Sequence, residues 1–227
     1  MMTKTLLAFV AAGAAMAAQS PLEMARDQQD RAALQKLVNE AADAAAKAPN
    51  DADAQYRMAV ASSYLAEVAL EVKDKKQAEE VAERGVKAAE RAVSLKPDSR
   101  SYVVLGTLCG QVVPANVLTG MGYAKRAQDA IEKAIQKDPK SSKAYEARGV
   151  GNYYLPKAFG GGYDLAIADF RKAIELDPKN AEAYLWLGLS LRKQNKDGEA
   201  RRAFEQSLQL DPNRVWTKQQ LDKTPAK

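Results

Sequence analysis

Five versions of one short proline motif divide this chain, and they constrain its fold more than any other feature. They are Ala48-Pro49-Asn50-Asp51, Lys96-Pro97-Asp98-Ser99, Asp138-Pro139-Lys140-Ser141, Asp177-Pro178-Lys179-Asn180 and Asp211-Pro212-Asn213-Arg214. Each follows an alanine-rich helical stretch, which a proline cannot continue. In most of them an Asp, Asn or Ser after the proline can cap a following helix. The motifs therefore predict a chain of similar helical units.

The last unit shows the pattern most clearly. Counted from Ala181, apolar and small residues fall at positions 4, 7, 8, 11, 20, 24 and 32, and they are Tyr184, Leu187, Gly188, Leu191, Ala200, Phe204 and Pro212. This spacing resembles the tetratricopeptide repeat (TPR), in which two antiparallel helices, A and B, cross closely at small residues. The unit departs from the TPR pattern with Tyr at position 4, Leu at position 11 and Ser207 at position 27.

Counting back from each proline finds the same helix B in every unit. Position 20 holds Leu37, Gly85, Ala127, Ala166 and Ala200; position 24 holds Ala41, Ala89, Ile131, Phe170 and Phe204; position 27 holds Ala44, Ala92, Ala134, Ala173 and Ser207. The resemblance covers residues 22–214. It implies an all-α fold, a TPR-like right-handed α-solenoid of antiparallel helix pairs.

The unequal proline spacing predicts units of different build. We expect a signal peptide over 1–17, an N-terminal capping helix over 18–51, and a unit with extended helices over 52–98. Units with inserted loops follow over 99–141 and 142–180, the second loop being rich in glycine. A regular unit spans 181–214, and a C-terminal capping helix and tail span 215–227, anchored by Trp216 and Leu221.

The N-terminus has the features of a secretory signal peptide. Lys4 precedes the apolar run Leu6–Ala14, and Ala15-Met16-Ala17 offers a cleavage site. We therefore expect a periplasmic or secreted protein, cleaved after Ala17, with no membrane span after cleavage. The alternative is an N-terminal anchor that is never cleaved. The single Cys109 cannot form an internal disulfide and falls at a packing position of its helix.

The glycine-rich insertion raises the first functional hypothesis. It contains Leu155, Pro156, Phe159, Gly160, Gly161 and Gly162, and Asp164 is expected to cap the next helix. The preceding unit carries its insertion, with Val117, Leu118 and Met121, at the corresponding turn. Stacking predicts that the two insertions adjoin and form a lip over one end of the groove. The alternative is that these residues only pack on neighbouring helix tips.

The TPR resemblance also implies a binding groove lined by helix A. The residues expected there to bind a partner are Tyr56, Tyr64, Arg100, Lys143, Tyr153, Tyr154, Arg192 and Lys193. Tyr and Arg are favoured at interfaces because each joins apolar area to a polar tip. The alternative is that the tyrosines serve packing. The Lys and Asn clamp by which some TPR proteins hold a peptide C-terminus is not reproduced, since Glu146 and Val150 stand there.

The absence of histidine argues against an enzyme, because it removes the commonest general base and metal ligand. We expect no cofactor and no metal. The net charge of +5 is mixed along the helices, which argues against nucleic acid. The predicted function is a scaffold that binds a protein or peptide. The alternatives are a carrier of a small apolar ligand, given a looser similarity to the T-component of TRAP transporters, and weak self-association.

Overall fold

A computed structural model describes residues 19–114 and 117–225 of the chain, and the described residues contain helices and no strand. The helices are α1 (Pro21–Asp27), α2 (Arg31–Lys47), α3 (Ala52–Glu71), α4 (Lys75–Leu95), α5 (Ser99–Val112), α6 (Val117–Lys137), α7 (Ser142–Tyr154), the 3-10 turn η1 (Lys157–Phe159), α8 (Tyr163–Leu176), α9 (Ala181–Lys193), α10 (Asp197–Leu210) and α11 (Val215–Asp222). The all-α TPR solenoid predicted from the sequence is confirmed.

The proline motifs end one helix and start the next, as their chemistry predicts. The Asp98 carboxylate accepts the backbone N–H of Ser101, and the Asn180 side-chain oxygen accepts that of Ala183. Both contacts satisfy an amide that has no partner within its own helix. Each motif therefore closes one helix pair and opens the next.

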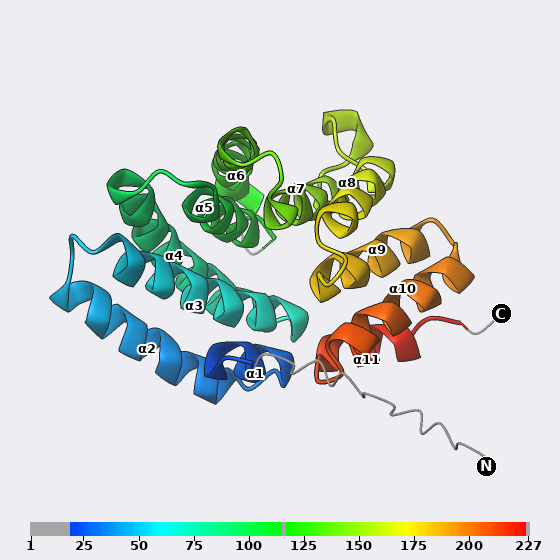
Figure 1. Cartoon of the computed structure of the whole chain (residues 1–227), viewed down its shortest axis with the longest axis horizontal. Coiled ribbons are helices and arrows are strands. Elements are labelled where there is room, and N and C mark those ends of the chain that lie inside the picture. Colours follow the sequence, from blue (N-terminus) through cyan, green and yellow to red (C-terminus); the bar gives the residue numbers. More distant parts are fainter. Residues whose placement is uncertain (1–18, 115–116, 226–227) are drawn as a thin grey trace, which may run out of the picture.

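The pairs α3/α4, α5/α6, α7/α8 and α9/α10 follow one another around an arc (Figure 1). The first helices of these pairs also pack on one another, α3 on α5, α5 on α7, and α7 on α9. They form the inner row of the arc, and their second helices lie behind them. The N-terminal segment, expected to hold one capping helix, holds two: α1 reverses at Gln29 and leads into α2.

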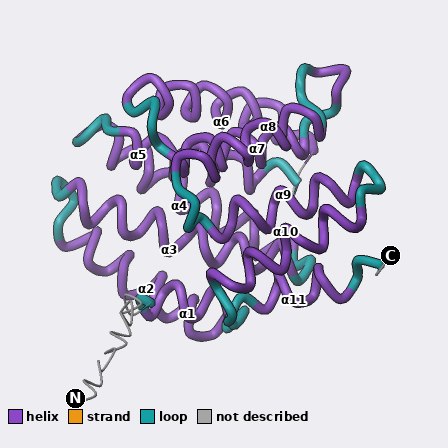
Figure 2. The backbone as a smooth tube through the Cα atoms, turned by 45° about the vertical axis from the view of Figure 1, so that its right-hand side comes forward, coloured by secondary structure: helices purple, strands orange, loops and turns teal. Residues whose placement is uncertain are grey.

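The two ends of the arc meet, so the solenoid closes on itself. Figures 1 and 2 both show α1 beside the last helices of the chain. Gln219 of α11 donates a hydrogen bond to Gln29, and Gln19 donates one to Asp211. The residues that these two hydrogen bonds join are 190 and 192 positions apart in the sequence. The inner row therefore lies within a closed ring of helices.

Two hydrophobic cores underlie the arc. The first, from α1 to α6, is built of Ala, Val and Leu; the second joins α8, α9 and α10 around Leu185, Leu189 and Phe204. In the second, Gly188 lies so close to the ring of Phe204 that an added Cβ would stand 2.6 Å from it. Small residues at helix crossings thus set the spacing of the pairs, as the repeat pattern predicts.

Candidate functional site

The candidate site is the inner face, by which we mean the surface that α1, α3, α7 and α9 turn toward the middle of the closed arc. Four side chains on these helices act electrostatically on one another: Glu23, Tyr64, Lys143 and Glu182. The backbone N–H of Ser20, with a smaller contribution from the Lys143 charge on α7, holds the pKa of Glu23 on α1 below its ordinary value. The Lys143 charge also acts on Tyr64 of α3, where it opposes the rise in pKa that burial causes. Helices distant in sequence therefore place charges and an aromatic ring around one space.

Two of the predicted tyrosines lie on α3 at this face, each covered by a guanidinium. The Arg26 guanidinium carbon lies 4.9 Å from the ring centre of Tyr64, and that of Arg100 lies 4.7 Å from the ring centre of Tyr56. Burial raises the pKa of both phenols, so they stay neutral hydrogen-bonding groups. Stacked cation and ring pairs of this kind hold the aromatic plane in a fixed orientation.

Lys143 is a predicted binding residue that a partner can reach from solvent. Its side chain is 60% exposed, and its Nζ lies 2.9 Å from Glu146 one turn along α7. Loss of hydration among the surrounding helices acts to lower the pKa of the Lys143 ammonium, but the charge of Glu146, and then that of Glu182, raises it above its ordinary value. The inner face thus presents a permanent cation that water still reaches.

An ionic cluster, which we call the closure cluster, locks the two ends of the arc together beside the inner face. It consists of Arg26, Asp27, Glu67, Glu71, Glu182, Asp211 and Arg214. Arg214 is 1% exposed, and its guanidinium donates to Glu182 at 2.8 Å and to Glu67 at 2.6 Å, and also to Glu71. A buried arginine with three carboxylate partners fixes α11 against α3 and α9.

The closure cluster holds five carboxylates and two guanidinium groups, so its protonation is unequal. Burial raises the pKa of Glu67 to about 8 and that of Asp27 to about 6. Burial would also raise the pKa of Glu182, but the guanidinium groups of Arg214 and then Arg26 hold it at about 2. Glu182 is therefore the fixed anion of the cluster, and Glu67 carries a proton near neutral pH.

The sequence analysis missed the closure cluster entirely. Glu67 and Glu71 stand four residues apart within the apolar run Tyr64–Val72, where charges on a buried face are unusual. Arg214 occupies the site where three earlier motifs carry Asp, Ser or Asn as a helix cap. The buried glutamates and the arginine at the cap position are each visible in the sequence. They lie 143 and 147 positions apart, so nothing local indicates that they pair.

The glycine-rich loop between α7 and α8 folds into a compact turn. Gly160 and Gly162 have φ angles of 87° and 116°, and Gly162 donates its N–H to the carbonyl of Asn152 at 2.8 Å. A Cβ on Gly161 would stand 2.2 Å from the Leu155 carbonyl oxygen. All three positions need glycine, two for their backbone angle and one for space.

Beside this turn lies a pocket of about 640 Å³. Its lining includes Tyr153, Tyr154, Leu155, Pro156, Gly160, Gly161, Gly162 and Tyr163. Tyr153 makes ring contacts with Tyr154 at 5.1 Å and Tyr163 at 5.4 Å between centroids. Tyr154 is 58% exposed, whereas Tyr153 is half-buried. The aromatic pair flanking the loop thus forms one wall of a real cavity.

The predicted lip differs from this arrangement in two respects. Phe159 does not line the pocket and is 75% exposed. Asp164 caps no helix. The N-cap residue of α8 is Gly162, which has no side chain to cap it, and the Asp164 carboxylate accepts a hydrogen bond from Gln194. The side chains of Val117, Leu118 and Met121, expected to complete the lip, lie outside the described residues.

The remaining predicted binding residues either form contacts within the chain or lie away from the inner face. Arg192 donates to the carbonyl of Gln220 and to its side-chain oxygen, so it holds α11 in place. Arg100 pairs with Asp53 and Asp98. Lys193 is exposed at the last turn of α9. Tyr56, Tyr64 and Lys143 are therefore the members that share the inner face, and Tyr153 and Tyr154 form a separate group.

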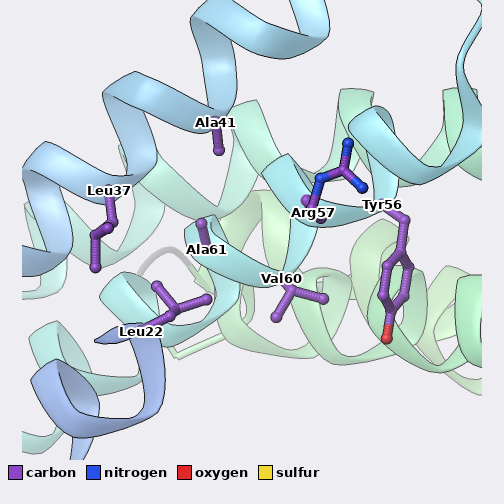
Figure 3. A pocket seen from close by; sticks show the side chains of 7 residues that line it. All are labelled: Leu22, Leu37, Ala41, Tyr56, Arg57, Val60 and Ala61. Carbon is purple, nitrogen blue, oxygen red and sulfur yellow. The ribbon is translucent and has the colours of Figure 1, made fainter. Parts of the chain in front are cut away.

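A second, smaller pocket of about 270 Å³ lies between α1, α2 and α3, and we call it the α1 pocket. Figure 3 shows its lining residues, Leu22, Leu37, Ala41, Tyr56, Arg57, Val60 and Ala61. Leu22 reaches it from α1, Leu37 and Ala41 from α2, and Val60 from α3, with the Arg57 guanidinium at one side (Figure 3). The lining is apolar apart from Tyr56 and Arg57.

The site offers binding groups rather than reactive ones. Cys109 is buried, and burial raises the pKa of its thiol to about 11, so it is held as a neutral thiol.

The described residues contain no group of His, Cys, Asp or Glu arranged to hold a metal ion. Across the same residues, no helix has the length and apolar character needed to cross a membrane.

Two family models match the C-terminal part of the chain, "TPR repeat" at residues 160–195 and "Tetratricopeptide repeat" at residues 181–214. No curated protein sequence matches the chain. Among solved structures, a thermophilic TPR protein of Thermus thermophilus is similar, with a TM-score of 0.63 and 17% identity over 89% of this chain and 96% of that one.

Two further solved structures have lower structural similarity to this chain. PilF of Pseudomonas aeruginosa has a TM-score of 0.49 and 18% identity over 76% of this chain and 68% of that one. The first TPR of Spaghetti, bound to an HSP90 peptide, has a TM-score of 0.45 and 24% identity over 56% and 94%. Residues 160–214 are thus tetratricopeptide repeats by the two family matches, and the stack of helix pairs shares the fold of the Thermus thermophilus TPR protein over most of the chain.

Proposed function

We propose that this protein is a non-enzymatic interaction scaffold that holds a segment of a partner polypeptide against its inner face. TPR repeats support a scaffold for protein–protein interaction. The observation that carries the proposal is the chemistry of the inner face, where Tyr56 and Tyr64 on α3 and the exposed Lys143 on α7 act on one another across one space. Oriented rings and an accessible cation are the groups that interfaces favour.

The inner face also suggests what the partner segment carries. Lys143 is exposed and pairs with Glu146, three residues along the same helix. A carboxylate of the partner can replace Glu146 in this ion pair. The neutral tyrosines can accept apolar or aromatic side chains and donate hydrogen bonds to a peptide carbonyl. We therefore expect a polar or acidic segment with at least one large apolar side chain.

A matched pair of charge reversals tests the inner face. Native mass spectrometry of the protein released from its own host first identifies the bound polypeptide. Lys143→Glu should then weaken that complex about tenfold or more and reduce its sensitivity to salt. Lys172→Glu is the control, since Lys172 pairs with Glu175 three residues on at 2.7 Å, but on the second helix of its pair. Equal loss in both variants would contradict the proposal.

A second candidate function is a carrier of a small apolar ligand, favoured by the pocket beside the glycine-rich loop. Its aromatic wall of Tyr153, Tyr154 and Tyr163 can bury an uncharged ligand. Native mass spectrometry would then show a bound small molecule in place of a polypeptide. Tyr163→Ala should release it with little dependence on salt, whereas Phe159→Ala, outside the lining, should leave it bound.

We also propose that the protein is exported, on the strength of its N-terminal sequence. Lys4, the apolar run Leu6–Ala14 and Ala15-Met16-Ala17 carry this proposal. N-terminal sequencing of the protein from its host tests it. A mature terminus at Ala18 is the expected result, and an intact N-terminus would favour an uncleaved anchor instead.

A further inference from the structure

The α1 pocket marks a place where the repeat is incomplete. Helix α1 has 7 residues, whereas α7 and α9, the first helices of two later pairs, each have 13. Six missing residues correspond to about 9 Å of helix at 1.5 Å per residue. Because α1 and α2 run antiparallel, the missing turns would lie over the C-terminal half of α2, where the pocket opens.

The shortening of α1 is built into the sequence. Ser20 and Glu23 form a reciprocal capping box, and Pro21 occupies the first turn. Both features start a helix at this residue and oppose its extension toward the N-terminus. The Gln19 side chain, just before α1, donates to Asp27 at 3.0 Å, at the far end of α1, and does not line the pocket. The groove is therefore not covered by the described chain.

Repeat position 24 shows what the missing turns leave open. In the four later units this position is buried, and its residues are Ala89, Ile131, Phe170 and Phe204. Its counterpart Ala41 on α2 is only partly buried, and so is Leu37 at position 20. In the four later units the first helix of the pair covers the surface around position 24, whereas on α2 this surface is uncovered. The fold itself thus specifies that the surface fits a helix.

The lining adds two requirements for the helix that would fit. The residue at position 24 is the small Ala41, as Ala89 is in the next unit, but here a pocket of about 270 Å³ remains that a large apolar side chain of the partner can fill. Arg57, exposed at the side of the pocket, forms no ion pair among the described residues. An acidic residue on the incoming helix would complement it.

We propose that the α1 pocket binds a short amphipathic helix of another protein, which presents a large apolar residue toward Ala41 and an acidic residue toward Arg57, and so completes the first repeat. The inference rests on the scaffold function proposed above, but it assigns the partner a second contact at a different place. Tyr56 borders both surfaces, so one partner can span them.

The test uses the full chain and a synthetic amphipathic helical peptide of Leu, Ala and Glu, with a variant of the same peptide in which Lys replaces Glu. Binding is measured by fluorescence anisotropy. The acidic peptide should bind saturably to the wild type, and Leu37→Asp should weaken it about tenfold or more. Met24→Asp is the control, because Met24 is an exposed apolar residue of α1 outside the pocket.

A charge swap makes the result specific. Arg57→Glu should weaken the acidic peptide and strengthen the basic one, which a loss of folding cannot do. No saturable binding, or binding unaffected by Leu37→Asp and Arg57→Glu, would overturn the proposal. It would also be overturned by a dimer that Leu37→Asp dissolves, since a second copy of the chain would then be the occupant.

The peptide test and the Lys143→Glu test separate the two proposals. If Leu37→Asp abolishes peptide binding while Lys143→Glu leaves the host complex intact, the α1 pocket stands and the inner face fails. The reverse outcome leaves the inner face as the binding surface and removes the α1 pocket.

Discussion

The two halves of this molecule solve the same packing problem with different residues. In the N-terminal half the crossings are filled by Ala, Val and Leu on the long helices α3 and α4, which have 20 and 21 residues. In the C-terminal half shorter helices close around Phe170, Phe204 and Trp186. The family models match only within the aromatic half. Helix length has thus replaced side-chain size as the source of buried area.

The closure cluster joins the two halves, and its loss should have the largest effect. Arg214→Ala leaves Glu67, Glu71 and Glu182 without their main cation, and breaking a buried pair of this kind costs about 3–5 kcal/mol. Chemical denaturation should show a lower midpoint and two separate transitions, one for each half. Arg202→Ala on the exposed side of α10 should stay within about 0.5 kcal/mol of wild type. A single unchanged transition in Arg214→Ala would show that the halves are not coupled there.

A substitution at repeat position 24 sharpens the comparison of the two cores. Phe204→Ala removes a fully buried ring and should lower the free energy of unfolding by about 3–5 kcal/mol. Ala89→Gly at the same position of the N-terminal half should cost only about 1 kcal/mol, mostly through helix propensity. Equal losses, measured by urea denaturation, would mean that the two cores do not differ in how they store stability.

Glycine at the crossings is the next most sensitive feature. Gly188→Ala would place a methyl group 2.6 Å from the ring of Phe204, and such overpacking typically costs about 1–3 kcal/mol. Gly151→Ala is the matched control within α7, where nothing lies within 4 Å of an added Cβ, and it should stabilise the protein by about 0.5–1 kcal/mol. Thermal unfolding of the two variants should therefore shift in opposite directions.

The seam between the halves should also respond to pH, as a gradual slope. Burial raises the pKa of Glu67 to about 8, so the folded protein binds a proton there that the unfolded chain releases above about pH 4.5. Stability should therefore fall as pH rises from about 5 to 8, by less than about 1.4 kcal/mol per pH unit for one proton. Glu67→Gln, which imitates the protonated acid, should flatten the slope measured by thermal unfolding. An unchanged slope would assign the pH dependence to other groups.

How far the sequence predicts this molecule depends on the range of the interactions. Pro178 and Asn180 mark a helix boundary through local chemistry, and Gly188 and Phe204 follow one repeat, so both were predictable. Arg192 follows the repeat too, but its guanidinium turns to Gln220, which spacing alone does not reveal. The local signal for α1, the capping box of Ser20 and Glu23, was present and was not used.

The site residues divide in the same way. Tyr56, Tyr64 and Lys143 share the inner face because helix positions repeat, which a single chain shows plainly. The closure cluster depends on how much the arc curves over the whole stack, and curvature accumulates from small rotations at every pair. No single motif carries that information, so the meeting of Arg214 with Glu67 could not be read from the sequence.

Closure also has a consequence for the order in which the chain folds. Open TPR stacks can nucleate at any pair and extend to their neighbours, because nearly all their contacts are local. Here Arg26 and Asp27 are made well before their partners Asp211 and Arg214. Contacts of such high sequence separation slow folding. Helix α1 can therefore form these ion pairs only after Asp211 and Arg214 have been made. In a chain truncated before Asp211, Arg26 and Asp27 would lack these partners.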